Sequence, residues 1–160
     1  MPNHISQFWR SPAGLIATWF GIGLLPGAPG TWASLAALPF AYGLLNAGGL
    51  WALTVASILV FLAGLWASSR AIKALGTDDP RQVVVDEVTG QWLALIPAGL
   101  DIRFWPVAFI AFRLADIVKP WPVSVAEKRL KGATGIMSDD IVAGVYGSIA
   151  TWAIVQWFNF

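Results

Sequence analysis

Five acidic side chains of this chain stand at the ends of apolar stretches or inside them. Asp86 and Glu87 open one stretch, Asp116 lies within a second, and Asp139 and Asp140 open a third. The chain has only nine acidic residues, so more than half of them occupy places where an unpaired charge is costly. Proteins relieve that cost with a counter-charge or a metal ion, which makes these residues candidates for a functional site.

The chemistry that such residues support is that of a hard metal ion. Mg²⁺ prefers oxygen ligands and is usually held by a few carboxylates together with a substrate phosphate. The chain contains no Cys and a single His, His4 near the N-terminus, which excludes thiolate metal sites, Cys nucleophiles and paired catalytic histidines. If the protein catalyses a hydrolysis, metal-activated water is the simplest nucleophile, with carboxylates holding the metal and one acting as base.

Basic residues accompany the acid in the second stretch. Arg113 precedes Asp116 by three residues and Lys119 follows it by three, so all three lie on one face of a helix. The two cations are either ion-pair partners of the acids or ligands of a phosphate. Lys128 and Arg129 are weaker candidates for phosphate binding, because basic residues at that point also suit a surface near anionic lipid headgroups.

Helix capping offers a structural interpretation of some of the acids. Asp139-Asp140 and Asp86-Glu87 each precede an expected helix, where an acidic side chain caps the first turn and complements the helix dipole. One member of each pair could therefore be only a cap. Asp116 has no such explanation, because it lies late in its segment, where a negative charge opposes the dipole.

Glycines mark two further places where backbone could approach a ligand or another helix. A Gly/Pro-rich loop over residues 21–30 runs into an expected helix from Trp32, with Thr31 as a possible N-cap. A second glycine-containing loop, residues 132–138, is expected to deliver the chain to Asp139. Gly90 and Gly144 each follow an acid by four residues, a spacing that would let two helices pack closely beside that acid.

Composition indicates an all-α integral membrane protein. The 160 residues are 57% hydrophobic and 12% charged, with a net charge of +1, so a nucleic-acid partner is not expected. Residues 50–68 carry no charge or proline and would reach about 28 Å as a helix, close to the thickness of a hydrocarbon core. A soluble all-α domain with very apolar helices is the alternative interpretation.

We expect one domain, residues 1–160, that forms a small helical bundle with about four to five membrane segments. Residues 1–20 do not resemble a cleaved signal and are expected to form an interfacial helix whose Trp and Phe side chains face lipid. Besides residues 50–68, the predicted membrane segments are residues 32–47, 83–100, 105–119 and 141–158.

Basic residues orient this predicted topology. With the first membrane segment starting in the cytoplasm, eight Lys and Arg residues fall on the cytoplasmic side and only Arg103 on the other side, in agreement with the positive-inside rule. The eight are Arg10, Arg70, Lys73, Arg81, Lys119, Lys128, Arg129 and Lys131. In this orientation all five acids of the candidate site lie at the cytoplasmic membrane face.

Four sequence blocks resemble the phosphatidylglycerophosphatase A family. They are GLLPGAPGTWAS at 23–34, DEVTG at 86–90, FRLADIVKPWP at 112–122 and GIMSDDIVAG at 135–144. The resemblance runs in order from about residue 20 to the C-terminus. Ala33 and Ala133 stand where the family usually or often has Gly, a change that is conservative in size.

The resemblance implies a Mg²⁺-dependent lipid phosphatase of the bacterial inner membrane. Such an enzyme converts phosphatidylglycerophosphate to phosphatidylglycerol and inorganic phosphate. The expected metal and base cluster is Asp86, Glu87, Asp116, Asp139 and Asp140. The expected substrate-binding residues are Thr31, Ser34, Arg113, Lys119, Lys128 and Arg129.

Two other classes of protein remain compatible with the residues alone. A cation-coupled transporter or channel would use intramembrane acids to bind the transported ion, although such sites usually lie near the membrane midplane rather than at one face. A membrane scaffold without enzymatic activity would use the acids only as caps and ion-pair partners. The sequence gives no indication of the oligomeric state.

Overall fold

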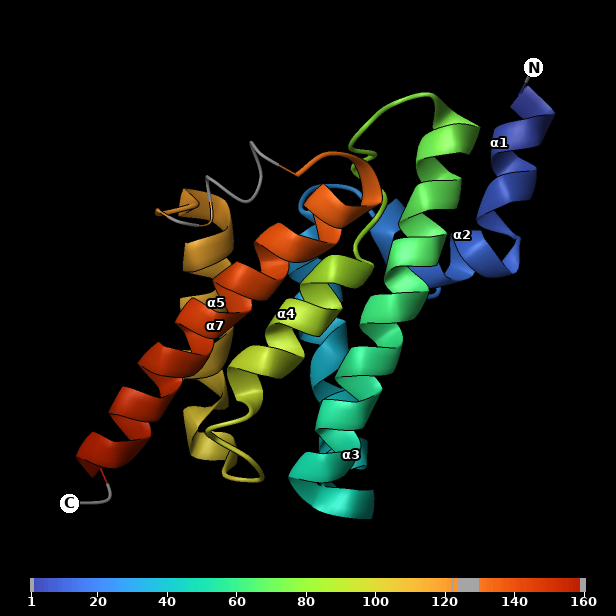
Figure 1. Ribbon diagram of the computed structural model, residues 1–160. Helices are drawn as coiled ribbons and strands as arrows, with labels where there is room; N and C mark the ends of the chain where they lie inside the picture. Colours follow the sequence, from blue (N-terminus) through green and yellow to red (C-terminus); the bar gives the residue numbers. More distant parts are fainter. Residues whose placement is uncertain (1, 122, 124–129, 159–160) are drawn as a thin grey trace.

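The computed structural model describes residues 2–121, 123 and 130–158, with residues 2 and 3 described by their backbone alone. Lys128 and Arg129 lie outside the described residues. The regular structure of the described residues is entirely helical, which confirms the all-α part of the predicted fold class (Figure 1). The helices are α1 (Pro2–Trp9), α2 (Pro12–Ala17), α3 (Pro29–Leu75), α4 (Val85–Leu95), α5 (Trp105–Val118) and α7 (Gly132–Phe158), with 3₁₀ turns η1 (Ile22–Leu24) and η2 (Ile102–Phe104).

The long helix α3 is a hairpin of two helical halves. Gly48 and Gly49 have non-helical backbone angles, and Gly49 adopts a φ of 62°, which a residue with a Cβ rarely adopts. Figure 1 shows the chain reversing at this point, so that both ends of α3 lie at the same end of the molecule. The halves correspond to the predicted segments at 32–47 and 50–68, each extended at its outer end.

The remaining segments depart from prediction in length. Helix α5 agrees closely with the segment expected at 105–119. Helix α4 has 11 residues, about 16 Å, which is too short to cross a hydrocarbon core alone. Helix α7 begins at Gly132 rather than near residue 141, so the loop expected at 132–138 is helical. Tertiary packing explains this extension, since Met137 is fully buried and fills the space beside Gly64 of α3.

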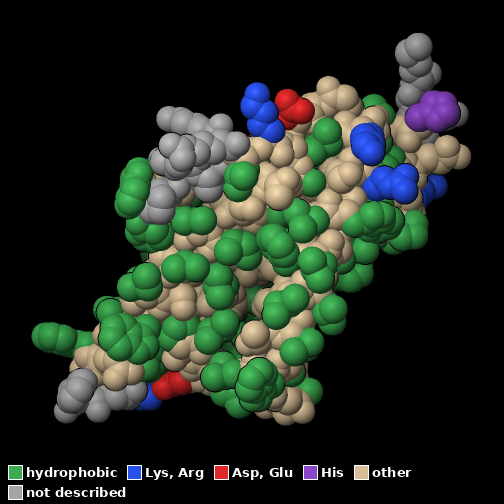
Figure 2. Space-filling view, in the orientation of Figure 1, with side chains coloured by type: hydrophobic (Ala, Val, Ile, Leu, Met, Phe, Trp, Pro, Cys, Tyr) green, Lys and Arg blue, Asp and Glu red, His purple; other side chains and the backbone are tan. Residues whose placement is uncertain are grey.

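Within the described residues, two helices, α3 and α7, are long and apolar enough to cross a membrane, with mean hydropathies of 2.1 and 1.4 over their most apolar windows. Many large apolar side chains face outward, including Trp51, which is 82% exposed, and Trp157, which is 79% exposed. Figure 2 shows hydrophobic side chains over the middle of the visible face and charged side chains towards its two ends. This distribution is typical of a protein surrounded by lipid.

The N-terminal segment forms two short helices instead of one. Ser11 caps α2 by accepting a hydrogen bond from the backbone N–H of Gly14. The expectation that its aromatic residues face lipid is wrong for Trp19, which is 6% exposed and packs against Phe40 and Trp92. Trp19 belongs to the core because the backbone turns sharply there, with a φ of 45°.

Helices α4 and α7 cross at two glycines. A Cβ at Gly144 would lie 2.7 Å from the carbonyl oxygen of Gly90, and a Cβ at Gly90 would lie 2.6 Å from the carbonyl oxygen of Asp140. Real Cβ atoms do not approach backbone oxygens this closely, so the crossing requires glycine on both helices. On the far side of α4, the indole N–H of Trp92 donates to the carbonyl of Ala37 in α3 at 2.9 Å.

The end of the bundle opposite the two ends of α3 carries few charges. Arg103 of η2 pairs with Asp101 at 2.6 Å, and both side chains reach solvent. The hydrogen bond from Arg103 lowers the pKa of the Asp101 carboxyl. These two residues thus neutralise each other at that end.

Replacing Gly144 with alanine tests the helix crossing. The added Cβ should force α4 and α7 apart and lower the free energy of unfolding by about 1–3 kcal/mol, as measured by denaturation in detergent micelles. Gly43→Ala is the matched control, because a Cβ at Gly43 would meet nothing within 4 Å. A Gly144→Ala variant as stable as Gly43→Ala would contradict the close crossing.

Candidate active site

A cavity of about 460 Å³ opens at the end of the bundle where both ends of α3 lie. Its wall combines the loop before α3, the loop between α3 and α4, and the facing turns of α4, α5 and α7. All five acids predicted from the sequence line it, together with Arg113 and Lys119. The structure therefore brings seven of the predicted site residues into one cavity.

Three of the acids form a tight group. Each of Asp86, Glu87 and Asp140 offers one oxygen, and these oxygens all lie within 4.8 Å of one another. The group is deep, since Asp86 is 9% exposed and Asp140 is 3% exposed. Asp86 Oδ1, Glu87 Oε2 and Asp140 Oδ2 are buried and have no hydrogen-bond partner among the described residues. We call these three residues the carboxylate trio.

The backbone positions the trio through close helix packing. Asp86 and Glu87 occupy the first turn of α4, and Asp140 lies on α7. Each of the crossing glycines, Gly90 and Gly144, lies one helical turn beyond an acid of the trio, so the crossing brings those acids together.

A third glycine makes room for Glu87. A Cβ at Gly30, in the first turn of α3, would collide with the Glu87 carboxylate. The carboxylate therefore occupies space that only glycine leaves open at that position.

The capping interpretation does not describe Asp139 and Asp140, and it describes the acids of α4 only in part. The N-cap of α4 is Val84, and no side chain caps that helix. Asp139 and Asp140 are the eighth and ninth residues of α7, because the helix begins at Gly132. Asp139 and Asp140 therefore do not satisfy the free backbone N–H groups at a helix start. Glu87 does so in part, because its carboxylate accepts a hydrogen bond from its own backbone N–H in the first turn of α4. Asp86 and Glu87 also lie favourably at the positive end of the α4 dipole.

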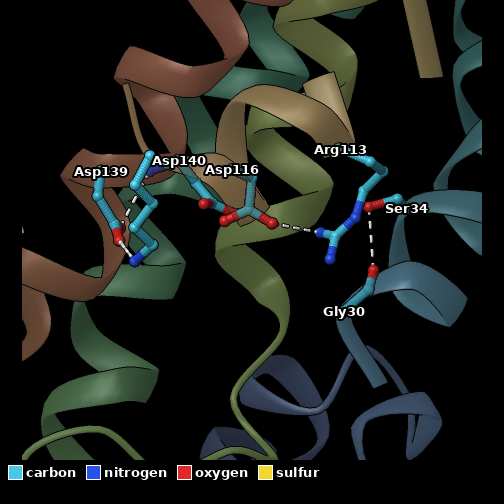
Figure 3. A network of polar contacts seen from close by, with 7 residues as sticks. Gly30, Ser34, Arg113, Asp116, Asp139 and Asp140 are labelled. Carbon is cyan, nitrogen blue, oxygen red and sulfur yellow. Dashed lines mark hydrogen bonds and ion pairs between the residues drawn. The ribbon is translucent and has the colours of Figure 1, made fainter. Parts of the chain in front are cut away.

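The other two acids are held by the two cations that the sequence placed on either side of Asp116, and Lys119 pairs with Asp139, a partner that the sequence did not predict. Arg113 Nη1 lies 2.6 Å from Asp116 Oδ2, and Lys119 Nζ lies 2.7 Å from Asp139 Oδ2. Figure 3 shows the Arg113 and Asp116 side chains pointing toward one another, with Asp139 and Asp140 nearby. Arg113 Nε is buried and has no hydrogen-bond partner among the described residues, so the guanidinium retains a donor for a further acceptor.

Electrostatics makes the trio unstable as three free carboxylates. Two unit charges 4.8 Å apart repel each other by about 3 kcal/mol at an effective dielectric constant of about 20. The partnerless oxygens of the trio match what a hard divalent cation requires, namely several convergent oxygen donors of net negative charge. The residues therefore fit a Mg²⁺-type ion, with Asp86, Glu87 and Asp140 as its protein ligands.

Two predicted substrate-binding residues lie away from the cavity wall. The Ser34 hydroxyl is buried and donates to the carbonyl of Gly30 at 2.9 Å within α3 (Figure 3). Thr31 is the third residue of α3, whose N-cap is Ala28, so Thr31 does not cap the helix. Residues 27–30, just before them in the chain, line the cavity instead.

Sequence reasoning missed four charged residues of the cavity mouth. Asp78, Asp79 and Arg81, in the loop between α3 and α4, and Lys131, just before α7, all line the cavity and are exposed. The acids resembled ordinary turn residues and the cations resembled inside-positive charges. The only sequence signal was proximity, because each of these residues lies within about ten positions of a trio residue.

Comparisons with known proteins identify the family to which this chain is similar. Residues 15–155 match the family described as Phosphatidylglycerophosphatase A. The chain is 36% identical over 149 residues to a Phosphatidylglycerophosphatase A of Haemophilus influenzae, covering 92% of this chain and 91% of the relative. It is 39% identical over 137 residues to a Phosphatidylglycerophosphatase A of Escherichia coli, covering 84% and 78% respectively.

A third relative has a different name. A Putative phosphatidylinositol-3-phosphatase of Bacteroides thetaiotaomicron is 39% identical over 156 residues, covering 89% of this chain and 92% of the relative. No solved structure matches the chain.

A double-mutant cycle on Lys119 and Asp139 tests whether their ion pair contributes to folding. Both side chains are at most 29% exposed, so Lys119→Met and Asp139→Asn should show a coupling energy of about 1 kcal/mol or more in detergent denaturation. The exposed Arg103–Asp101 pair is the control, and its coupling should be smaller. Equal coupling for the two pairs would contradict the desolvated environment assigned to Lys119 and Asp139.

Proposed function

The chain belongs to the phosphatidylglycerophosphatase A family and is a phosphoric monoester hydrolase, and we propose that it hydrolyses phosphatidylglycerophosphate with Mg²⁺ at the cytoplasmic membrane face. The products are phosphatidylglycerol and inorganic phosphate. The observation that carries the proposal is one cavity in which three carboxylates, each with one buried oxygen that has no hydrogen-bond partner among the described residues, lie beside two ion-paired cations. Metal and phosphate binding require these two sets of groups together.

Asp86, Glu87 and Asp140 would hold the ion, which supplies Lewis-acid polarisation of the phosphate and a more acidic bound water. Arg113 and Lys119 orient the terminal phosphate, and their ion pairs with Asp116 and Asp139 fix the direction of their N–H groups. These acids also limit the net positive charge around the phosphate.

The reaction needs a proton acceptor and a proton donor. A water oxygen forms the new bond to phosphorus while the bond from phosphorus to the glycerol oxygen breaks. One carboxylate of the five accepts the water proton, and the departing glycerol oxygen takes up a proton. Burial of the site favours this arrangement because charge–charge interactions are strong where water is excluded.

The substrate class follows from the names of the relatives. Phosphatidylglycerophosphate and a phosphatidylinositol 3-phosphate are both lipids with one phosphodiester and one terminal phosphomonoester. The acyl chains of such a lipid remain in the bilayer while the monoester enters a cavity at headgroup level. The outward-facing apolar surface of the bundle and the cavity at one of its ends support this mode of binding.

The cytoplasmic location is supported by the distribution of basic residues. Arg70, Lys73, Arg81 and Lys131 lie in or next to the loops at the cavity end, whereas Arg103 lies at the opposite end. This asymmetry favours an orientation with the cavity facing the cytoplasm of a bacterial inner membrane. The number of membrane crossings proposed is five: two in α3 and one each through α4 with its following turns, α5 and α7.

Phosphate release from phosphatidylglycerophosphate by the purified protein tests the function and the metal together. EDTA should abolish release and Mg²⁺ should restore it. Asp86→Asn and Asp140→Asn should each lower kcat by about 100-fold or more, because each removes a charged ligand of the trio. Asp101→Asn, at the far end of the bundle, should retain wild-type activity. Full activity in EDTA, or in Asp140→Asn, would refute the assigned metal site.

The orientation can be tested with introduced cysteines, because the chain has none of its own. Thr77→Cys places a thiol in the exposed loop after α3, and Ile102→Cys places one at the opposite end, where Ile102 is 62% exposed. In intact spheroplasts a membrane-impermeant maleimide should label Ile102→Cys alone, and after lysis it should label both variants. Labelling of Thr77→Cys alone before lysis would reverse the proposed orientation.

A further inference from the structure

The cavity contains cations of two kinds. Arg113 and Lys119 are each paired with a carboxylate at 2.6 and 2.7 Å. Arg81 and Lys131 line the same cavity but form no ion pair with any described residue. Arg81 makes one long hydrogen bond, from Nη2 to the carbonyl of Gly27 at 3.4 Å. Among the described residues, two of the four cations that line the cavity therefore have their charge available to a ligand.

The two unpaired cations lie at a different depth from the trio. Arg81 and Lys131 are exposed, whereas Asp86 and Asp140 are almost completely buried. Arg81 comes from the loop after α3, and Lys131 directly precedes α7, so the two approach the mouth from separate elements. The cavity thus has an acidic floor, suited to a metal-bound phosphate. Its mouth carries Arg81 and Lys131 together with two exposed acids, Asp78 and Asp79, neither of which forms an ion pair with a described cation.

A lipid with two phosphates matches this division. Its terminal monoester must reach the floor, where the carboxylate trio lies. Its phosphodiester is joined to the acyl chains and so stays nearer to the bilayer surface and the cavity mouth. A phosphodiester carries one negative charge, and Arg or Lys side chains are its usual partners.

We propose that Arg81 and Lys131 form a phosphodiester subsite at the cavity mouth, which selects lipids that carry a second phosphate. This inference rests on the proposed lipid-phosphatase function and names the part of the substrate that these residues recognise. Through its hydrogen bond to Gly27, Arg81 also connects the subsite to the backbone segment 27–30 of the cavity wall.

A different explanation is that Arg81 and Lys131 are general surface charges that attract anionic lipid. Exposed cations outside the cavity provide a matched control for this general charge effect. Arg70 and Lys73 are also exposed cations close to the C-terminal end of α3, but they line a separate groove with Phe8 and Trp66. A general charge effect should therefore be shared by Lys73, whereas a subsite effect should not.

The test compares two inhibitors of phosphatidylglycerophosphate hydrolysis in neutral-detergent micelles. Phosphatidylglycerol carries the diester without the monoester, and inorganic phosphate resembles the monoester alone. Arg81→Gln and Lys131→Gln should each raise the Ki of phosphatidylglycerol about tenfold or more, because each removes a charge-assisted hydrogen bond. The Ki of inorganic phosphate should stay within about twofold, and Lys73→Gln should change neither constant.

Three results would overturn the subsite. In the first, the Ki values of both inhibitors rise by the same factor in Arg81→Gln and Lys131→Gln. In the second, Lys73→Gln raises the Ki of phosphatidylglycerol as much as Arg81→Gln and Lys131→Gln do. In the third, phosphatidylglycerol fails to inhibit the wild-type enzyme at mole fractions far above the KM of the substrate. A wild-type protein that releases no phosphate from phosphatidylglycerophosphate with Mg²⁺ present would instead refute the proposed function itself.

Discussion

The close crossing of α4 and α7 at Gly90 and Gly144 is the constraint on which the site depends. Backbone meets backbone there, because a Cβ at Gly144 would lie 2.7 Å from the carbonyl oxygen of Gly90. One turn before each glycine stands an acid, Asp86 or Asp140. A wider crossing would separate these carboxylates, and their oxygens could then no longer converge on one ion. Helix packing and the proposed metal site thus depend on the same few residues.

The same crossing brings carboxylates close enough to repel one another, and cations of the cavity compensate only part of this negative charge. Five acids of α4, α5 and α7 line the cavity, and two of them are neutralised by Arg113 and Lys119. The remaining three have buried oxygens without partners. Repulsion among them opposes folding of the metal-free protein and strengthens binding of a divalent cation, since the ion removes the repulsion. In a protein with this arrangement, binding of a cation therefore raises the free energy of unfolding.

Much of this site could be predicted from residue types and spacing. An acid in an apolar segment must be compensated, so Asp86, Asp116 and Asp140 were identifiable as site residues, and the i, i+3 spacing identified Arg113 as the partner of Asp116. The glycine spacing likewise predicted close helix approach. These signals are local or energetic, and a single sequence contains them.

The rest depended on tertiary contacts that a sequence does not contain. The start of α7 at Gly132 is stabilised by burial of Met137 against Gly64, a contact between residues far apart in the chain. That extension removed the capping explanation of Asp139. Trp19 is buried although its segment resembles an interfacial helix, and Arg81 and Lys131 reach the cavity only through the paths of their loops.

The central claim is that Asp86, Glu87 and Asp140 together hold a divalent cation. Crystals of the protein grown with Mn²⁺ in place of Mg²⁺ would test it through anomalous diffraction. The account predicts an anomalous peak bounded by the carboxylates of all three residues, which disappears in Asp140→Asn. A Mn²⁺ peak elsewhere in a catalytically active protein, or none at a Mn²⁺ concentration that supports full activity, would contradict it.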